Sequence, residues 1–165
     1  SVVAAHVTHW GQRPVPFACA VALSGRFGFD LDLDALSDED RATCTAAAAA
    51  YRRIGDLVQQ GDLHRLVSPV GSTRAALAFV APDGERAVVF AYRLPGDGDG
   101  DGGADATSVI ELPWLADHLG WVVEDLTPGA PGATFRRAAE GVPWPDAAPP
   151  SASVLELSRP GAPGG

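Results

Sequence analysis

The sequence contains no methionine, lysine or asparagine, and its only isoleucines are Ile54 and Ile110. AT-rich codons encode all four residue types, so their scarcity indicates a GC-rich genome and says little about function. The chain begins at Ser1, with no charged and apolar leader followed by a cleavage site. We therefore expect it to be an excised piece of a longer protein.

Basic residues are also scarce. Twelve arginines stand against 21 acidic residues, which gives a formal net charge of −9. Binding to a phosphate backbone requires clustered basic side chains, so we expect no nucleic-acid partner. No apolar run reaches the roughly 18 residues of a membrane span, so we expect no membrane partner either. The composition is typical of an acidic, soluble protein, which we expect to be cytoplasmic.

The residue types that bind metals do not form a site in the sequence, and we expect no cofactor. Cys19 and Cys44 lack the spacing of a zinc site and are expected to be buried, reduced thiols, with a disulfide between them as the alternative. The run Asp97–Gly102 imitates the start of a calcium loop. Its twelfth position is Ser108, where a bidentate glutamate is required, so we expect a solvated connector.

The first part of the chain has the pattern strand, helix, strand, helix. Residues 2–8 are apolar enough for a buried parallel strand, and a short helix opens near Pro14. Apolar residues then alternate with glycine and aspartate from Phe27 to Leu33, which predicts a second strand. A long helix is predicted from an N-cap at Ser37 to residue 60.

The second part of the chain is predicted to be β. Short apolar segments separated by proline and glycine clusters favour an antiparallel β-sandwich over residues 62–160, followed by a disordered tail at 161–165. The predicted strands are residues 75–80, 86–94, 107–112, 120–126, 133–137 and 153–158; residues 97–105 and 143–150 are predicted loops.

Two β/α units cannot close a barrel, which needs about 250 residues. Residues 1–61 therefore fit the last quarter of a larger α/β domain, to which the β domain is appended.

Three segments carry a family resemblance: Ala5-His6-Val7-Thr8-His9-Trp10-Gly11, Phe27-Gly28-Phe29-Asp30, and Gly61-Asp62-Leu63-His64-Arg65-Leu66-Val67-Ser68-Pro69. In order and spacing they resemble the C-terminal region of glycoside hydrolase family 36, the retaining α-galactosidases. The apolar hairpin at residues 78–93 is also similar to that family's C-terminal domain.

The resemblance implies that residues 1–61 are strand 7 to helix 8 of a catalytic (β/α)8 TIM barrel, within a homo-oligomeric enzyme. It implies hydrolysis of terminal α-galactosyl residues from melibiose- or raffinose-type oligosaccharides by double displacement. The family's two catalytic aspartates lie on earlier barrel strands, so we expect no catalytic residue in this chain and no activity from it alone. Asp30, Asp32 and Asp34 are no substitute, because they lie along one face of one predicted strand.

His6, His9 and Trp10 are the candidate substrate-binding residues. They fall at the carboxyl end of a predicted parallel strand, the end where barrel enzymes place their active sites. Trp10 is suited to stack on a sugar, and a histidine to hydrogen-bond a hydroxyl group. The alternative is that His6 is a core residue and that Trp10 covers the neighbouring loop.

A non-catalytic carbohydrate-binding or interaction module is the alternative function. The strand, helix, strand, helix pattern favours the enzyme, since a free-standing binding module has no use for it.

Overall fold

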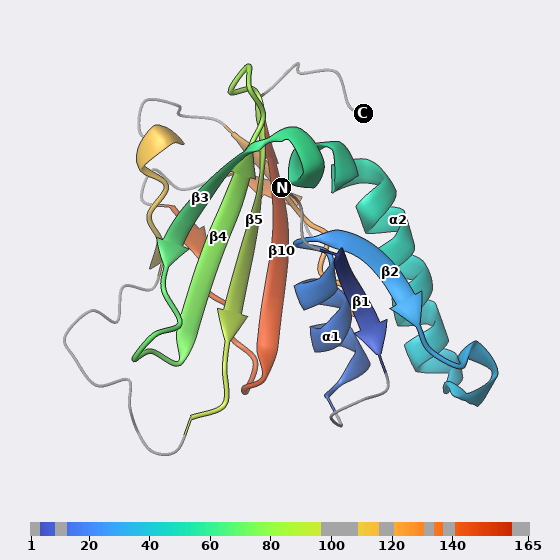
Figure 1. Cartoon of the computed structure of the whole chain (residues 1–165). Coiled ribbons are helices and arrows are strands. Elements are labelled where there is room, and N and C mark those ends of the chain that lie inside the picture. Colours follow the sequence, from blue (N-terminus) through green and yellow to red (C-terminus); the bar gives the residue numbers. More distant parts are fainter. Residues whose placement is uncertain are drawn as a thin grey trace.

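The computed structural model describes residues 4–8, 13–96, 109–115, 121–130, 134–136 and 141–159. Its elements form four layers: a two-stranded parallel sheet, a pair of helices, a six-stranded antiparallel sheet, and a two-stranded ribbon (Figure 1). One cluster of buried side chains fills each of the three spaces between neighbouring layers.

The first half of the chain folds as strand, helix, strand, helix, as predicted. The elements are β1 (Ala4–Thr8), α1 (Val15–Ala22), β2 (Arg26–Asp30) and α2 (Asp38–Gln60). Strands β1 and β2 pair in parallel, with Ala4 opposite Arg26 and Thr8 opposite Asp30. Whether they belong to a barrel stays a prediction.

Helix α2 begins and ends where its sequence predicts. The Ser37 hydroxyl accepts a hydrogen bond from the Asp40 amide, and acidic residues fill the first turn, where they interact favourably with the helix dipole. At the other end, the Gly61 amide donates to the Leu57 carbonyl. A Cβ atom on Gly61 would lie 2.5 Å from the Leu57 oxygen and 2.9 Å from the Val80 oxygen, so only glycine fits at this turn.

The predicted strand from Phe27 to Leu33 is too long. Strand β2 ends at Asp30, and a 3-10 turn follows at Leu33–Ala35. The Asp32 carboxylate accepts a hydrogen bond from the Asp34 amide, and this local bond caps the turn in place of a continued strand.

The second half of the chain is antiparallel, as predicted. The large sheet has the order β3-β4-β5-β10-β7-β8, and β6 pairs with β9 in the ribbon. Strands β3 and β9 were not predicted, and β6 is shorter than the predicted segment 107–112. The bounds are β3 Asp62–Val67, β4 Arg74–Val80, β5 Arg86–Arg93, β6 Val109–Ile110, β7 Val122–Asp125, β8 Thr134–Arg136, β9 Val142–Pro143 and β10 Ser151–Ser158.

Strand β5 runs through the centre of the large sheet and sends side chains into two clusters. Ala87, Val89 and Ala91 pack toward the ribbon, with Trp121 in the same cluster. The alternate residues, Val88, Phe90 and Tyr92, pack toward the helices. The helix-side cluster also holds buried side chains from both helices, namely Ala20, Leu23, Ala50, Ile54, Leu57 and Val58.

Cys19 and Cys44 are free thiols, buried between the helices and the parallel strands. Burial raises the pKa of Cys19 to about 12, with a smaller contribution from the nearby Cys44. Both cysteines therefore act as small apolar core residues, the first of the two alternatives predicted.

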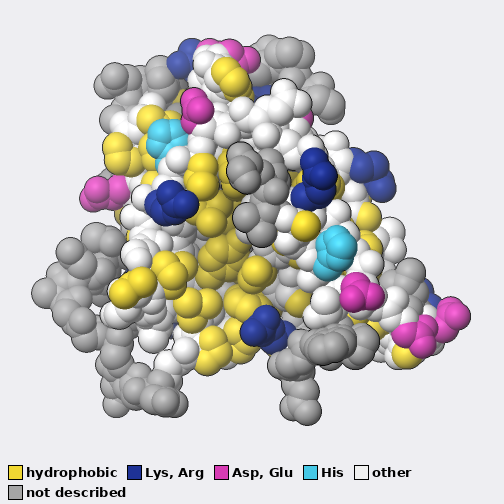
Figure 2. Space-filling view, in the orientation of Figure 1, with side chains coloured by type: hydrophobic (Ala, Val, Ile, Leu, Met, Phe, Trp, Pro, Cys, Tyr) yellow, Lys and Arg dark blue, Asp and Glu magenta, His cyan; other side chains and the backbone are white. Residues whose placement is uncertain are grey.

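No helix in the described part of the chain combines the length and the apolar character needed to cross a membrane. In Figure 2, exposed hydrophobic side chains form a group in the middle of the face, and charged side chains lie around it. The helices thus cover the sheet incompletely on the side that this view presents.

Candidate functional site

The candidate site lies on the face of the β1–β2 pair that the helices leave uncovered. Ala5 and Val7 point to the helices, and Val7 is 1% exposed within the cluster there. Because side chains alternate along a strand, His6 and Thr8 belong to the opposite face. His6 is exposed, and the register places it opposite Gly28, while Thr8 stands opposite Asp30.

The imidazole of His6 lies directly over Gly28. A Cβ atom at residue 28 would stand 2.9 Å from Cδ2 and 3.0 Å from Nε2 of His6. Any side chain at this position would therefore displace the ring. The absence of a side chain at Gly28, in the Phe27-Gly28-Phe29-Asp30 segment, therefore leaves room for the His6 ring.

His6 and Thr8 also line a cleft of about 510 Å³ at the free side of β1. Arg13 and Phe17 form part of its wall. The rest of the wall includes Leu94, Pro95 and Pro150, which come from the ends of strands in the large sheet. No pattern in the sequence points to these three residues, because only the folded chain brings them to β1.

The other predicted site residues, His9 and Trp10, lie outside the described residues. The same holds for the calcium-like run Asp97–Gly102 and for the predicted tail. Asp30 and Asp32 are exposed at and just beyond the end of β2. Among the residues that the structure describes, no three histidine, cysteine or acidic side chains gather in a group that could hold a metal ion.

A cluster of charged residues joins α2 to the large sheet. Arg53 of α2 donates two hydrogen bonds to the Glu124 carboxylate, both 2.6 Å long, and also pairs with Glu156. Arg86 of β5 bonds to Glu156 at 2.8 Å and to Asp56 at 3.2 Å. The Arg53 hydrogen bonds lower the pKa of Glu124. Because these opposite charges pair with one another, we infer that the cluster stabilises the packing of α2 on the large sheet.

The large sheet and the parallel pair together form a fold found in solved glycosidases. The structure of AgaB from Geobacillus stearothermophilus matches 94% of this chain with a TM-score of 0.71 and 26% sequence identity. An AgaA variant from the same organism, in complex with stachyose, matches 94% with a TM-score of 0.73 and 26% identity. Both are described as family 36 α-galactosidases, and the chain covers 21% of each.

Curated sequences give the same result. Alpha-galactosidase 1 of Pediococcus pentosaceus is 40% identical over 75 residues, and AgaA of Geobacillus stearothermophilus is 36% identical over 74 residues. These alignments cover 46% and 45% of this chain and 10% of each relative. No protein-family model matches the chain. The predicted resemblance to the α-galactosidases of glycoside hydrolase family 36 is confirmed, for a chain that spans about a tenth of its curated relatives.

Proposed function

We propose that this chain is part of a retaining α-galactosidase, which removes terminal α-galactosyl residues from galacto-oligosaccharides of the melibiose or raffinose type. The similarity to α-galactosidases in both sequence and structure carries the proposal. In it, the two catalytic carboxylates of the double displacement lie in the rest of the enzyme. The cytoplasmic location and the homo-oligomer stay predictions.

The proposal includes a TIM barrel to which β1, α1, β2 and α2 contribute two units. Parallel strands are almost always found in sheets covered on both faces and extended by further strands. In the described residues, the β1–β2 pair has helices on one face only and no third strand at either edge. Further barrel strands would satisfy both edges and enclose the open face. Residues 1–61 then complete the barrel, and residues 62–160 form the appended β domain.

In this arrangement His6, His9 and Trp10 bind the substrate. The uncovered face of β1, with His6 and Thr8, faces the barrel interior, and the chain after Thr8 leaves from the carboxyl end of the strand. That end carries the active site in barrel enzymes. An exposed imidazole held over Gly28 is suited to hydrogen-bond a sugar hydroxyl.

The test is release of p-nitrophenol from p-nitrophenyl α-galactoside. We expect turnover from the full-length protein and none from the 165-residue chain alone. The β-galactoside serves as the control substrate and should not be hydrolysed. If the full-length protein does not hydrolyse the α-galactoside, the proposal is wrong; if the isolated chain hydrolyses it, the location of the carboxylates is wrong.

Trp10 provides a separate test of the site. In the full-length enzyme, Trp10→Ala should lower kcat/KM for α-galactosides about tenfold, the effect of losing one stacking contact of ~1.4 kcal/mol. Trp10→Phe, which keeps an aromatic face, should retain most of the activity. Unchanged kinetics in Trp10→Ala would assign the residue to packing.

A further inference from the structure

A second cleft lies on the far side of the large sheet from the helices, between β3, β4 and the ribbon. Its volume is about 940 Å³, which is within the range of small-molecule sites. The lining comes from five separate segments of the β domain: β3, β4 with the turn before it, β6 with the residues after it, the 3-10 turn η2 (Pro113–Leu115), and the residue after β9.

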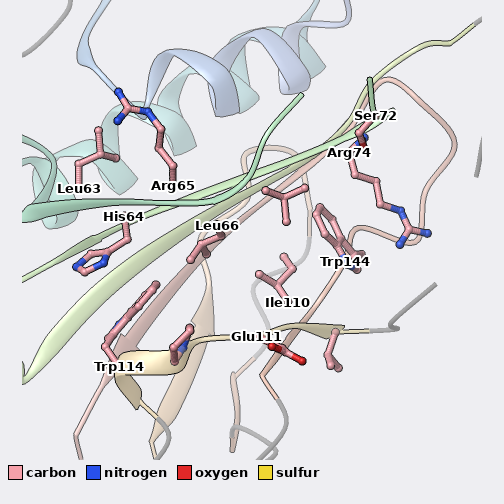
Figure 3. A pocket seen from close by; sticks show the side chains of 13 residues that line it. Leu63, His64, Arg65, Leu66, Ser72, Arg74, Ile110, Glu111, Trp114 and Trp144 are labelled. Atoms are coloured by element: carbon pink, nitrogen blue, oxygen red, sulfur yellow. The ribbon is translucent and has the colours of Figure 1, made fainter. Parts of the chain in front are cut away.

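Two half-buried tryptophans line this cleft, and each carries a polar partner (Figure 3). The ring of Trp114 stacks on that of His64, with centroids 4.3 Å apart and planes inclined by 29°. The Arg74 guanidinium lies 5.2 Å from the centroid of the Trp144 ring. In the view of Figure 3 these pairs stand toward opposite ends, with Leu66 and Ile110 between them.

The indole of Trp114 has no hydrogen-bond acceptor among the described residues, and its Nε1 atom is buried. A buried donor without an acceptor costs free energy, so native structures almost always supply one. Because this nitrogen is closed off from solvent, the surface that Trp114 offers to a ligand is the apolar part of its ring.

The chemistry of the lining fits a sugar. The tryptophans offer flat apolar surfaces to the C–H face of a pyranose ring. Around them stand donors, acceptors and groups that are both: His64, Arg74, Ser72 and the exposed Glu111. Such a mixture suits a neutral molecule with many hydroxyls. Charge of neither sign dominates the lining, because Glu111 stands against Arg65 and Arg74.

We propose that this cleft is a second saccharide-binding site, on the opposite side of the large sheet from His6, which holds a galactosyl-bearing saccharide chain between Trp114 and Trp144. The choice of galactosyl units rests on the proposed function, whereas the binding of a saccharide rests on the cleft itself. Because His6 lies on β1, beyond the helix layer and the sheet, the two sites do not overlap.

The test is native affinity electrophoresis of the full-length protein in gels that contain galactomannan. An excess of 1-deoxygalactonojirimycin, with which family 36 AgaA has been solved, occupies the proposed active site. We expect galactomannan to retard the protein under these conditions. Trp144→Ala and Trp114→Ala should each weaken the affinity about tenfold, and Trp144→Phe should lose much less.

Two further variants keep the result clear. Tyr51→Ala removes a half-buried ring from α2, on the other side of the sheet, and should leave the retardation unchanged. Glu111→Gln removes one charge from an exposed side chain without opening a cavity, and should weaken the affinity threefold or more. Circular dichroism checks the fold of each variant.

Equal retardation of the unchanged protein and of the folded tryptophan and Glu111→Gln variants would overturn the proposal. So would a protein that galactomannan does not retard at all. Neither result depends on hydrolysis of p-nitrophenyl α-galactoside, so failure of the second site and failure of the proposed function are distinguishable.

Discussion

Glu156 is the only buried charged residue among those described, with 4% of its surface exposed. It points from β10 toward the helices and pairs with both Arg53 and Arg86. Its carboxylate therefore lies between two guanidinium groups that would otherwise repel each other where helix and sheet meet.

Replacing Glu156 with alanine should lower the free energy of unfolding by about 3 kcal/mol, because it removes the buried partner of Arg86 and leaves that mostly buried guanidinium with the exposed Asp56 alone. Urea denaturation measures the loss. The matched control is Glu85→Ala, which breaks the half-exposed pair with Arg159 and should cost less than about 1 kcal/mol. Equal losses in the two variants would contradict this account of the cluster.

Glu124 should make stability depend on pH. The Arg53 hydrogen bonds lower its pKa in the folded state, so the native protein binds its proton less readily than the unfolded chain does. Its stabilising contribution is complete above the ordinary pKa of about 4.5 and is lost as the pH falls through the lower, folded-state pKa. Denaturation at a series of pH values should show a shallower acid dependence in Glu124→Gln. An identical dependence would mean that the bond to Arg53 does not persist in solution.

Residues close together in sequence were predicted better than those that meet across the fold. Strand β1 lies within the predicted segment 2–8, because the apolar residues that indicate it are neighbours in the sequence. By contrast, Arg53 and Glu124 are 71 positions apart. No pattern in the sequence distinguishes Arg53, which joins the cluster, from the exposed Arg52 beside it.

At the scale of elements, Gly61 controls the passage from α2 into β3. Gly61→Ala should destabilise the protein by about 3 kcal/mol, because the new Cβ meets two backbone oxygens that cannot move independently. Gly84, in the β4–β5 turn, has a φ of +70° and open space around its Cα. Gly84→Ala should cost only the strain of that conformation, about 1 kcal/mol. Thermal denaturation of the two variants checks the order, and the reverse order would contradict the role given to Gly61.

The elements whose ends carry local signals were predicted accurately. Helix α2 has a capping serine before it and a glycine after it, so both ends were found. Strand β3 was missed because a bulge between Arg65 and Val67 interrupts its alternation. Strand β9 is two residues long and contains Pro143, which is typical of a loop. The second cleft needs β3, η2 and the residue after β9 together, and it was not predicted from the sequence.

At the scale of the whole molecule, the two halves share a core. Ile54 and Leu57 of α2 are buried in one cluster with Val88 and Phe90 of β5. Because neither group stays buried without the other, α2 and β5 should open together. Hydrogen exchange should then give similar opening free energies for the amides of these four residues. Much weaker protection in α2 than in β5 would mean that the two halves are energetically independent.

The layering also bears on how chains of this fold can be recombined. Gly61, where the helical half gives way to strands, is the obvious place to join halves from two parent sequences. Yet α2 packs its two sides into different clusters, Cys44 and Ala47 toward the parallel strands and Ile54 and Leu57 toward the large sheet. A crossover at Gly61 would pack a helix from one parent against a sheet from the other. The core side chains of the two parents are not selected to fit each other. A shuffled library should therefore yield more folded members when each chimera inherits α2 and the sheet from a single parent.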